Sequence, residues 1–403
     1  MSEGAGRWRL QLKQNRWLRA AHAPLKAALQ EHRAGTEQRR YQRIALQRGL
    51  QVPAEATLAG AVRARRAARG LPAVAGSSAD LHIFLAYPLA NWETVLEPAL
   101  AAHGRVTPFE WRSLGFDDRR EDWFRQRPAM NAAMLAAFAA AQRERPVDAV
   151  VGYLSGWNTA PATIREMARA GATVLNFSWD DKLHYRGRDA DGWPEGPAAL
   201  AAEVDLNLTN APDSVLKYLV DGGLATFWPE AASAAIHRPY DLPFEYDVAF
   251  VGTCYGWRPR LVRALQRSGI RVAAFGHGWP AGPLPDAEMV RIYSRSRINL
   301  GFGGVGYSRR LLCLKGRDFE VPMAGGLYLT QHNPELERVY RIGAEILTYR
   351  DAADCIATVR ELLADPQRCQ SIRAAGRARA LADHTWEKRF LQAFRLAGLG
   401  TVG

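Results

Sequence analysis

The chain has 403 residues, which is enough for two or three domains of ordinary size. Its 48% apolar and 23% charged residues are typical of a globular protein and exclude a disordered or fibrous one. The formal net charge of +12 favours anionic partners such as a nucleotide, a phosphorylated sugar or an anionic membrane surface. The basic residues match no known nucleic-acid module, so we expect no nucleic-acid partner.

The four cysteines, Cys254, Cys313, Cys355 and Cys369, show no CxxC spacing. This pattern argues against a zinc site and a disulfide framework, and it is typical of a reducing compartment. We expect no membrane-spanning helix, because no run of about 18 apolar residues is present. The N-terminus also lacks an apolar segment of signal-peptide length. We therefore predict a cytoplasmic location, with peripheral contact at the inner membrane face as an open alternative.

Residues 1–78 are predicted to form a basic helical extension. Leucine and tryptophan recur there among Arg, Lys and Gln, and residues 72–78 are typical of a linker. Such a segment can be a helix packed on the main body, an amphipathic helix on a membrane surface or a partly disordered arm. We favour the packed or partly ordered extension, because Ala-rich helices with Arg faces are commonly solvated. Membrane contact through residues 1–70 is the alternative.

Residues 79–240 are predicted to form a first α/β domain, because short apolar runs alternate with longer helical segments. The expected strands are 81–86, 106–110, 147–153, 173–177, 206–210 and 225–228, and the expected helices are 91–103, 121–143 and 160–170. Alternating strands and helices indicate a parallel sheet with helices on both faces.

Residues 241–385 are predicted to form a second α/β domain. Its expected strands are 247–253, 270–276, 296–302, 327–330 and 345–349, and its expected helices are 257–268, 352–364 and 366–383. Residues 386–403 hold a C-terminal helix, for which crossing back to the first domain is one option. The predicted fold class is therefore α/β, with two Rossmann-like domains facing a cleft where ligands bind beyond the carboxyl ends of the strands.

The stretch from Lys315 to Gly326 is the main candidate for a ligand site. Glu320 lies there between the cations Lys315 and Arg317 and a small-residue turn. A carboxylate can accept hydrogen bonds from ribose hydroxyls, while nearby amides and cations can hold phosphate. The alternative is a helix–strand connection with a solvated charge pair.

The second domain also carries an ordered series of short motifs. They are Phe319–Gly326, Asn333–Leu336, Gly343–Ile346, Tyr349–Asp351, Ala375–Arg377 and His384–Arg389. Over residues 247–390 this series resembles the C-terminal domain of GT-B glycosyltransferases of the group 1 type, in particular the CgeB-like (spore maturation protein) branch. The first domain resembles the family only in its rhythm of strands and helices.

The resemblance implies that the second domain binds a nucleotide-diphosphate sugar and that the first domain binds an acceptor. UDP is the expected nucleotide, with GDP or dTDP as alternatives, and no metal or other cofactor is expected. The acceptor hydroxyl can belong to a glycan, a lipid-linked saccharide, a protein or a small molecule, with cell-surface polysaccharide synthesis as the expected setting. The alternative is a non-catalytic protein that binds nucleotide sugars or anionic polymers on the same scaffold.

Related enzymes carry two glutamates eight positions apart in the main motif. Glu320 matches the second, which holds the ribose hydroxyls, whereas the first falls at Leu312. The chain thus departs from the usual pattern of retaining enzymes, and neither retention nor inversion is predicted. Lys315 or Arg317 is a candidate to take over pyrophosphate or sugar contacts.

Further candidates for donor binding follow strands or glycine turns. Arg258 follows the turn at Gly252, and a guanidinium group can bind phosphate through two hydrogen bonds; the alternative is a solvated helix face. His277 follows a strand-end glycine and can contact the base or a phosphate, or serve only structure. Gly306 and Arg309 belong to a glycine-rich loop that can cradle pyrophosphate, although its spacing is not a Walker or Rossmann fingerprint.

Two carboxylates, Asp180 and Asp181, follow the strand at 173–177 and are the candidates for catalysis. One of them can act as general base toward an acceptor hydroxyl, or bind the acceptor or a cation. The alternative is a cap at a helix N-terminus. Trp157 also follows a strand and can stack on a sugar ring or pack in the core, and His184 is a weaker candidate.

Overall fold

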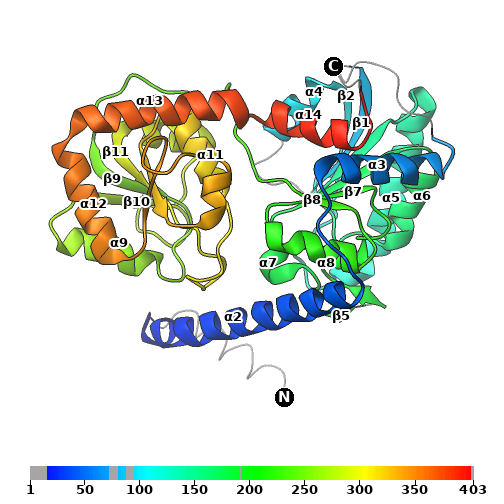
Figure 1. Ribbon diagram of the computed structural model, residues 1–403, viewed down its shortest axis with the longest axis horizontal. Helices are drawn as coiled ribbons and strands as arrows, with labels where there is room; N and C mark the ends of the chain where they lie inside the picture. The colour runs from blue at the N-terminus through cyan, green and yellow to red at the C-terminus, as the bar shows by residue number, and fades with distance from the viewer. Residues whose placement is uncertain (1–15, 72–79, 88–94, 191, 401–403) are drawn as a thin grey trace.

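The computed structural model describes residues 16–71, 80–87, 95–190 and 192–400. The linker predicted at 72–78 and the start of the helix predicted at 91–103 lie outside the described residues. Two α/β domains stand side by side, joined by crossing connections on one side and by a long N-terminal helix on the other (Figure 1).

The first domain is built on a six-stranded parallel sheet with strand order β2-β1-β3-β4-β7-β8. The strands are β1 (Leu81–Tyr87), β2 (Gly104–Glu110), β3 (Ala149–Gly152), β4 (Thr173–Ser178), β7 (Leu206–Thr209) and β8 (Ala225–Phe227). The helices are α4 (Leu96–Ala101), α5 (Trp123–Glu144), α6 (Pro161–Arg169), α7 (Asp181–His184) and α8 (Val215–Val220), and β5 (Asp189–Ala190) pairs with β6 (Trp193–Pro194) as a short antiparallel hairpin.

The apolar runs form this sheet because both of its faces are covered. All seven residues of β1 are buried. Ile83 and Leu85 join the core on one face of the sheet, whereas Phe84 and Ala86 join the core on the other. This alternation is expected for a parallel strand that is buried on both sides.

The second domain has a five-stranded parallel sheet with strand order β10-β9-β11-β12-β13. The strands are β9 (Tyr246–Val251), β10 (Val272–Phe275), β11 (Ser296–Leu300), β12 (Tyr328–Gln331) and β13 (Leu347–Tyr349). The helices are α9 (Arg258–Arg267), α10 (Asp286–Arg295), α11 (Gly316–Met323), α12 (Ala352–Ala364) and α13 (Pro366–Asp383). The motif at 315–326 therefore forms a helix that leads directly into β12.

The last helix, α14 (Trp386–Leu396), leaves the second domain and packs on the first (Figure 1). Trp386, Phe390 and Phe394 belong to the same core cluster as Ile83. Beside this crossing, the segment after β8 runs from the first domain to the second. The two connections are tied together, because the backbone N–H of Ala232 donates to the carbonyl of His384 at 3.0 Å.

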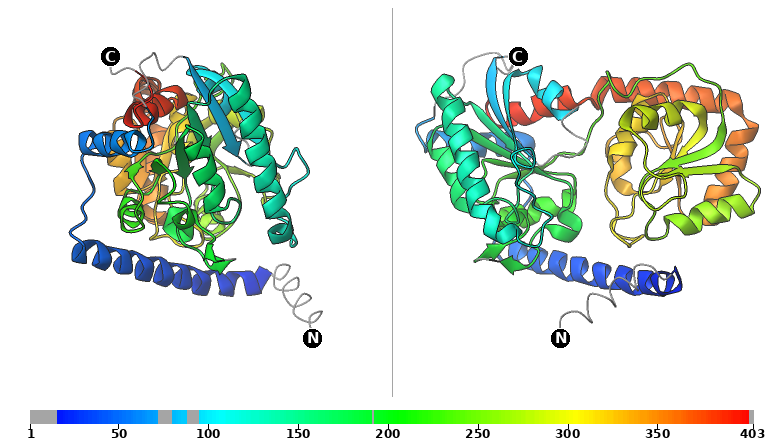
Figure 2. Two further views of the ribbon diagram at one scale, coloured as in Figure 1. Left: turned by 90° about the vertical axis from the view of Figure 1, so that its right-hand side faces the viewer. Right: turned by 180° about the vertical axis from the view of Figure 1, so that it is seen from behind.

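The N-terminal extension forms α2 (Arg16–Gln47) and α3 (Glu55–Ala67). The views in Figures 1 and 2 show α2 running along one side of both domains. Tyr41 donates a hydrogen bond to Asp221 of the first domain at 2.8 Å. Gln30 accepts one from the backbone N–H of Tyr307 of the second domain, also at 2.8 Å. The described part of the extension is thus a packed element that bridges the domains, and no helix among the described residues is long and apolar enough to cross a bilayer.

Candidate functional site

The order of the strands in the second domain indicates where a ligand can bind. In the second domain the strand order reverses between β9 and β11, which are neighbours in the sheet. Ligands of open parallel sheets bind beyond the carboxyl ends of the strands at such a point. Gly252 follows β9 there with φ of 154°, and a Cβ atom on it would lie 3.1 Å from Nη1 of Arg317. Glycine thus lets this turn approach the arginine closely.

Two guanidinium groups meet at this turn. The Cζ atoms of Arg258 and Arg317 lie 5.5 and 5.4 Å from the ring centroid of Phe250. Arg258 donates to the carbonyl of Thr253 at 3.0 Å, and burial together with neighbouring Arg317 lowers the pKa of Arg258 to about 10. In the described part of the chain neither guanidinium forms an ion pair with a carboxylate, and Nε of Arg317 is buried without a hydrogen bond. The pair is suited to bind a phosphate group between them.

Lys315 is the N-cap residue of α11, two residues before Arg317. The backbone N–H of Lys315 donates to Oδ2 of Asp318 at 2.7 Å, and the Tyr328 hydroxyl donates to Oδ1 at 2.7 Å. Burial raises the pKa of Asp318 to about 6. Burial alone would lower the pKa of Lys315, but Cys313 and Glu230 reverse this and raise it. The first turn of α11 therefore presents a stable cation to the same region.

Glu320 lies one turn further along α11. It lines a cavity of about 220 Å³ together with Arg317, Glu230 and Asp286; this cavity is called the Glu320 cavity below. The Tyr293 hydroxyl donates to Oε2 of Glu320 at 3.4 Å. Other walls of the cavity are aromatic residues of the first domain and the C-terminal helix, so it lies between the domains. Glu320 and Arg317 are thus brought together as expected.

The glycine-rich loop faces a different cavity. Arg309 lies over the ring of Trp257 at 4.4 Å and lines a cavity of about 530 Å³ that α2 closes. A Cβ atom on Gly306 would lie 2.7 Å from Oε1 of Gln30, so this glycine accommodates α2. The expected cradle for pyrophosphate is not formed next to Glu320, because the N-terminal helix occupies the loop.

His277 is also set apart from the Glu320 cavity. Its side chain is exposed, and its backbone carbonyl accepts a hydrogen bond from the N–H of Cys254 at 2.8 Å. The Glu320 cavity is not lined by His277, Gly306 or Arg309, all of which belong to the described part of the chain. Their predicted roles in donor binding therefore have no support from the geometry of this cavity.

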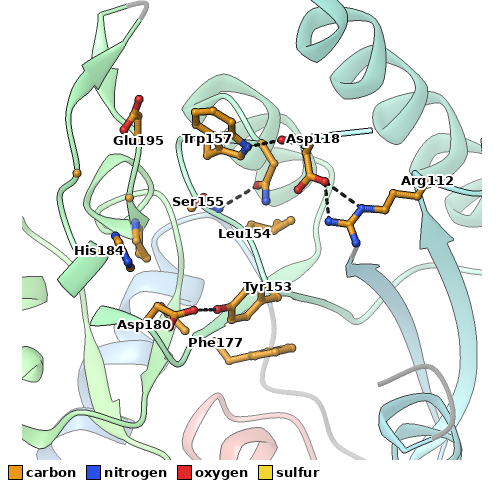
Figure 3. Close-up of a pocket in the computed structure, with 15 residues that line it drawn as sticks. Arg112, Asp118, Tyr153, Leu154, Ser155, Trp157, Phe177, Asp180, His184 and Glu195 are labelled. Carbon is orange, nitrogen blue, oxygen red and sulfur yellow. Dashed lines mark hydrogen bonds and ion pairs between the residues drawn. The ribbon is translucent and has the colours of Figure 1, made fainter. Parts of the chain in front are cut away.

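The first domain has its own cavity, of about 380 Å³, at the carboxyl ends of β3 and β4 (Figure 3). Asp180 is exposed there, and its Oδ2 accepts a hydrogen bond from the Tyr153 hydroxyl at 2.7 Å. Burial, followed by the charge of Asp180, raises the pKa of Tyr153 well above its usual value. Asp180 occupies the N-cap position of α7 but makes no capping bond with its side chain. Its carboxylate is thus available in the cavity, as a general base requires.

Asp181 points the other way. It is fully buried and accepts hydrogen bonds from Ser178 Oγ at 2.6 Å and from the Tyr218 hydroxyl at 2.9 Å. Burial raises the pKa of Asp181. The first turn of α7 directs the side chains of Asp180 and Asp181 to different sides. The prediction of Asp181 as a catalytic candidate therefore needs correction, because its carboxylate is hydrogen-bonded inside the domain and does not face the cleft.

The rim of this cavity is held by a polar network (Figure 3). The Trp157 indole donates to the carbonyl of Asp118 at 2.9 Å, and Arg112 pairs with the Asp118 carboxylate at 2.7 Å. Trp157 is half-buried with its ring edge against Phe124 at 4.8 Å. His184 also lines the cavity. The sequence did not single out Arg112 or Asp118, since both lie in an irregular segment after β2.

The most important residue missed from the sequence is Glu230. It follows β8 in the connection between the domains and lines the Glu320 cavity. A carboxylate close after a strand end is the only local signal that could have suggested it. The described residues contain no group of three or more His, Cys, Asp or Glu that could hold a metal ion. Metal independence stays a prediction.

Comparisons with known proteins agree with this arrangement. Residues 258–395 match the family model described as glycosyl transferase-like, which covers about a third of the chain. The structure is similar to sucrose-phosphate synthase from Thermosynechococcus elongatus, with a TM-score of 0.54, 13% identity, and 78% of this chain and 98% of that chain covered. The chain has the GT-B fold. The predicted fold class is thereby confirmed.

Two further GT-B structures are similar to this chain to about the same degree. A glycosyltransferase from Rickettsia africae ESF-5 has a TM-score of 0.53 at 11% identity, with 79% of this chain and 98% of that chain covered. Anabaena HepE in complex with UDP and glucose has a TM-score of 0.52 at 10% identity, with 78% and 98% covered. A search of curated protein sequences finds no match.

Proposed function

We propose that this protein is a glycosyltransferase that moves a sugar from a nucleotide-diphosphate sugar to an acceptor hydroxyl. The observation that carries the proposal is the pair of guanidinium groups at Arg258 and Arg317, neither of which forms an ion pair with a carboxylate in the described chain. Of this pair, Arg317 lines the cavity of Glu320, two residues after Lys315 in the chain. Two cations at a turn suit a diphosphate, and a nearby carboxylate suits ribose hydroxyls.

The acceptor side of the proposal rests on Asp180. Its carboxylate is exposed in the first-domain cavity and is oriented by the Tyr153 hydroxyl. A positioned carboxylate within hydrogen-bond reach of a hydroxyl can accept its proton as the new glycosidic bond forms. The cations of the second domain would meanwhile stabilise the charge on the leaving diphosphate, in place of a metal ion.

UDP is the nucleotide we propose first, with GDP and dTDP as alternatives. The structure of HepE in complex with UDP and glucose supports this order, since it shares the fold. The resemblance of the second-domain motifs to the CgeB-like branch adds a proposed setting in cell-surface polysaccharide synthesis. The chain is proposed to act in the cytoplasm.

A thermal-shift screen with UDP, GDP, ADP, CMP and dTDP sugars tests the proposal. A donor that binds the folded state should raise its stability by about 2.7 kcal/mol at a concentration 100-fold above the dissociation constant. Glu320→Ala should remove most of this increase, whereas Glu337→Gln, on an exposed site in the same domain, should keep it. Failure of every nucleotide sugar to stabilise the wild type would contradict the proposal.

A further inference from the structure

Two carboxyl groups from distant parts of the chain meet at Gly316. A Cβ atom on Gly316 would lie 2.8 Å from Oε2 of Glu230 and 2.8 Å from Oε1 of Glu320. Glu320 belongs to α11, whereas Glu230 belongs to the connection after β8. Both line the Glu320 cavity. A side chain at 316 would push the two carboxyl ends aside, so the glycine lets both face the same space.

The surroundings of Glu230 favour its protonated form. Burial raises the pKa of Glu230 to about 8, against the opposing effect of Lys315 and Arg317, while Glu320 and Asp318 raise it further. The other titratable groups that face it are His237 on the connection, Asp286 at the start of α10, and Cys313 and Tyr153, whose pKa values its charge raises. A protonated carboxyl group can donate a hydrogen bond as well as accept one.

The position of Glu230 is fixed by the crossing between the domains. Two residues beyond it, Ala232 pairs with the segment that enters α14: its N–H donates to His384 and its carbonyl accepts from the N–H of Trp386 at 3.2 Å. The Arg389 guanidinium also lies 3.5 Å from the carbonyl of Glu230. Glu230 is therefore held in the connection between the two domains, next to the first turn of α11.

We propose that Glu230 is a second carboxyl group of the donor site and that its protonated form donates a hydrogen bond to the bound nucleotide sugar. This inference rests on the proposed function.

The chemistry predicts a pH dependence with a definite sign. Loss of the proton from Glu230 removes the hydrogen-bond donor and adds a negative charge close to Glu320 and to the anionic diphosphate. Donor affinity should therefore fall as the pH rises above 8. If the deprotonated form does not bind, the dissociation constant rises about tenfold for each further pH unit. Glutamine at 230 has the shape of the protonated group and does not titrate in this range.

The test is isothermal titration of the whole protein with UDP-glucose, GDP-glucose and dTDP-glucose between pH 6.5 and 9. Wild type and Glu337→Gln should lose affinity toward pH 9, whereas Glu230→Gln should bind equally well at pH 7 and 9. Glu230→Ala should bind about tenfold more weakly at pH 7, because a hydrogen bond to a charged ligand is lost. Glu337 is exposed and remote from the cavity lining, which makes it the matched control.

The outcomes separate this inference from the proposed function. The role of Glu230 is overturned if the wild type binds a donor with an affinity independent of pH. It is also overturned if Glu230→Gln loses donor affinity toward pH 9 as the wild type does. Either result leaves the proposed function standing. Wild type that binds neither these three donors nor any nucleotide sugar of the thermal-shift screen overturns the proposed function and this inference with it.

Discussion

Arg258 and Arg317 both lie near the ring of Phe250, with Cζ atoms 5.5 and 5.4 Å from its centroid, and in the described chain neither forms an ion pair with a carboxylate. Burial of Arg258, followed by the like charge of neighbouring Arg317, lowers the pKa of Arg258. Such an arrangement is stabilised by an anion. The two arginines are therefore the part of the structure that points most directly to a diphosphate ligand.

Replacing Arg258 with methionine should weaken the binding of UDP-glucose by about tenfold to a hundredfold. Hydrogen bonds to charged groups contribute about 1.5–3 kcal/mol, and methionine keeps the apolar contacts with the aromatic rings. Titration calorimetry measures the change. Arg263→Met, on the exposed face of the same helix, is the control and should bind as the wild type does. Equal affinity of the two variants would show that Arg258 does not contact the donor.

An ion pair joins the domains on the side of α7. Lys182 Nζ lies 3.0 Å from Oε1 of Glu335 and 3.1 Å from Asp213, with side-chain exposures of 14% and 12% for Lys182 and Glu335. Lys182→Met should lower the free energy of unfolding by about 2 kcal/mol, because it leaves a half-buried carboxylate without its cation. The double variant Lys182→Met/Glu335→Gln should be less destabilised than the single one in urea unfolding. Purely additive effects would contradict a direct coupling.

The N-terminal helix α2 should restrain the glycine-rich loop. Ser308 Oγ donates to Glu31 at 2.6 Å, and Gln30 accepts from the N–H of Tyr307. Gln30→Ala/Glu31→Ala should raise the amide exchange rates of residues 304–310, because the loop loses two of its hydrogen bonds. Gln42→Ala, on the exposed side of the same helix, should leave them unchanged. Unaltered exchange in the double variant would show that α2 does not order this loop.

The stability of the protein should depend on pH through Glu230. Its pKa is about 8 in the folded state and near 4.5 when unperturbed, so the folded state holds the proton more tightly. The free energy of unfolding should therefore fall as the pH rises from about 4.5 to about 8. Glu230→Gln does not lose a proton in this range. Its stability relative to the wild type should thus increase by an amount on the order of 3 kcal/mol between pH 5 and 8.5.

Urea unfolding at pH 5 and 8.5 checks this prediction without any donor. Glu337→Gln should follow the pH dependence of the wild type. If the free energies of unfolding of Glu230→Gln and the wild type differ by the same amount at both pH values, Glu230 does not have a raised pKa in the folded protein.

Much of the fold could be predicted from local sequence. The strands β1 and β4 appear as apolar runs because a parallel sheet buries both faces, and the helices at 352–364 and 366–383 were predicted with the bounds that the structure has. The helix α10 was not predicted, because the glycines and prolines before it obscure its start. The bounds of α11 were not predicted either, since Pro322 and the following glycines obscure this helix.

The site could be predicted only in part. Glu320 and Arg317 are three residues apart in the chain, so their proximity follows from the sequence. Glu230 and Glu320 meet only because the connection after β8 passes the first turn of α11, and no local sequence pattern predicts that contact. Asp180 and Asp181 are adjacent in the sequence, yet one is exposed and the other fully buried. Side-chain direction at a strand end depends on the loop that follows, which residue types alone do not determine.

The most direct test of glycosyl transfer is the release of nucleoside diphosphate from a nucleotide sugar in the presence of glycan, lipid-linked, protein and small-molecule acceptors. The donor found in the binding screen should be consumed in proportion to the amount of wild-type protein. Glu320→Ala should be at least about tenfold slower, with Glu337→Gln unchanged. If the protein binds the donor but neither transfers its sugar to any of these acceptors nor hydrolyses it, the result would contradict the proposed glycosyltransferase activity. It would favour a non-catalytic nucleotide-sugar binding protein.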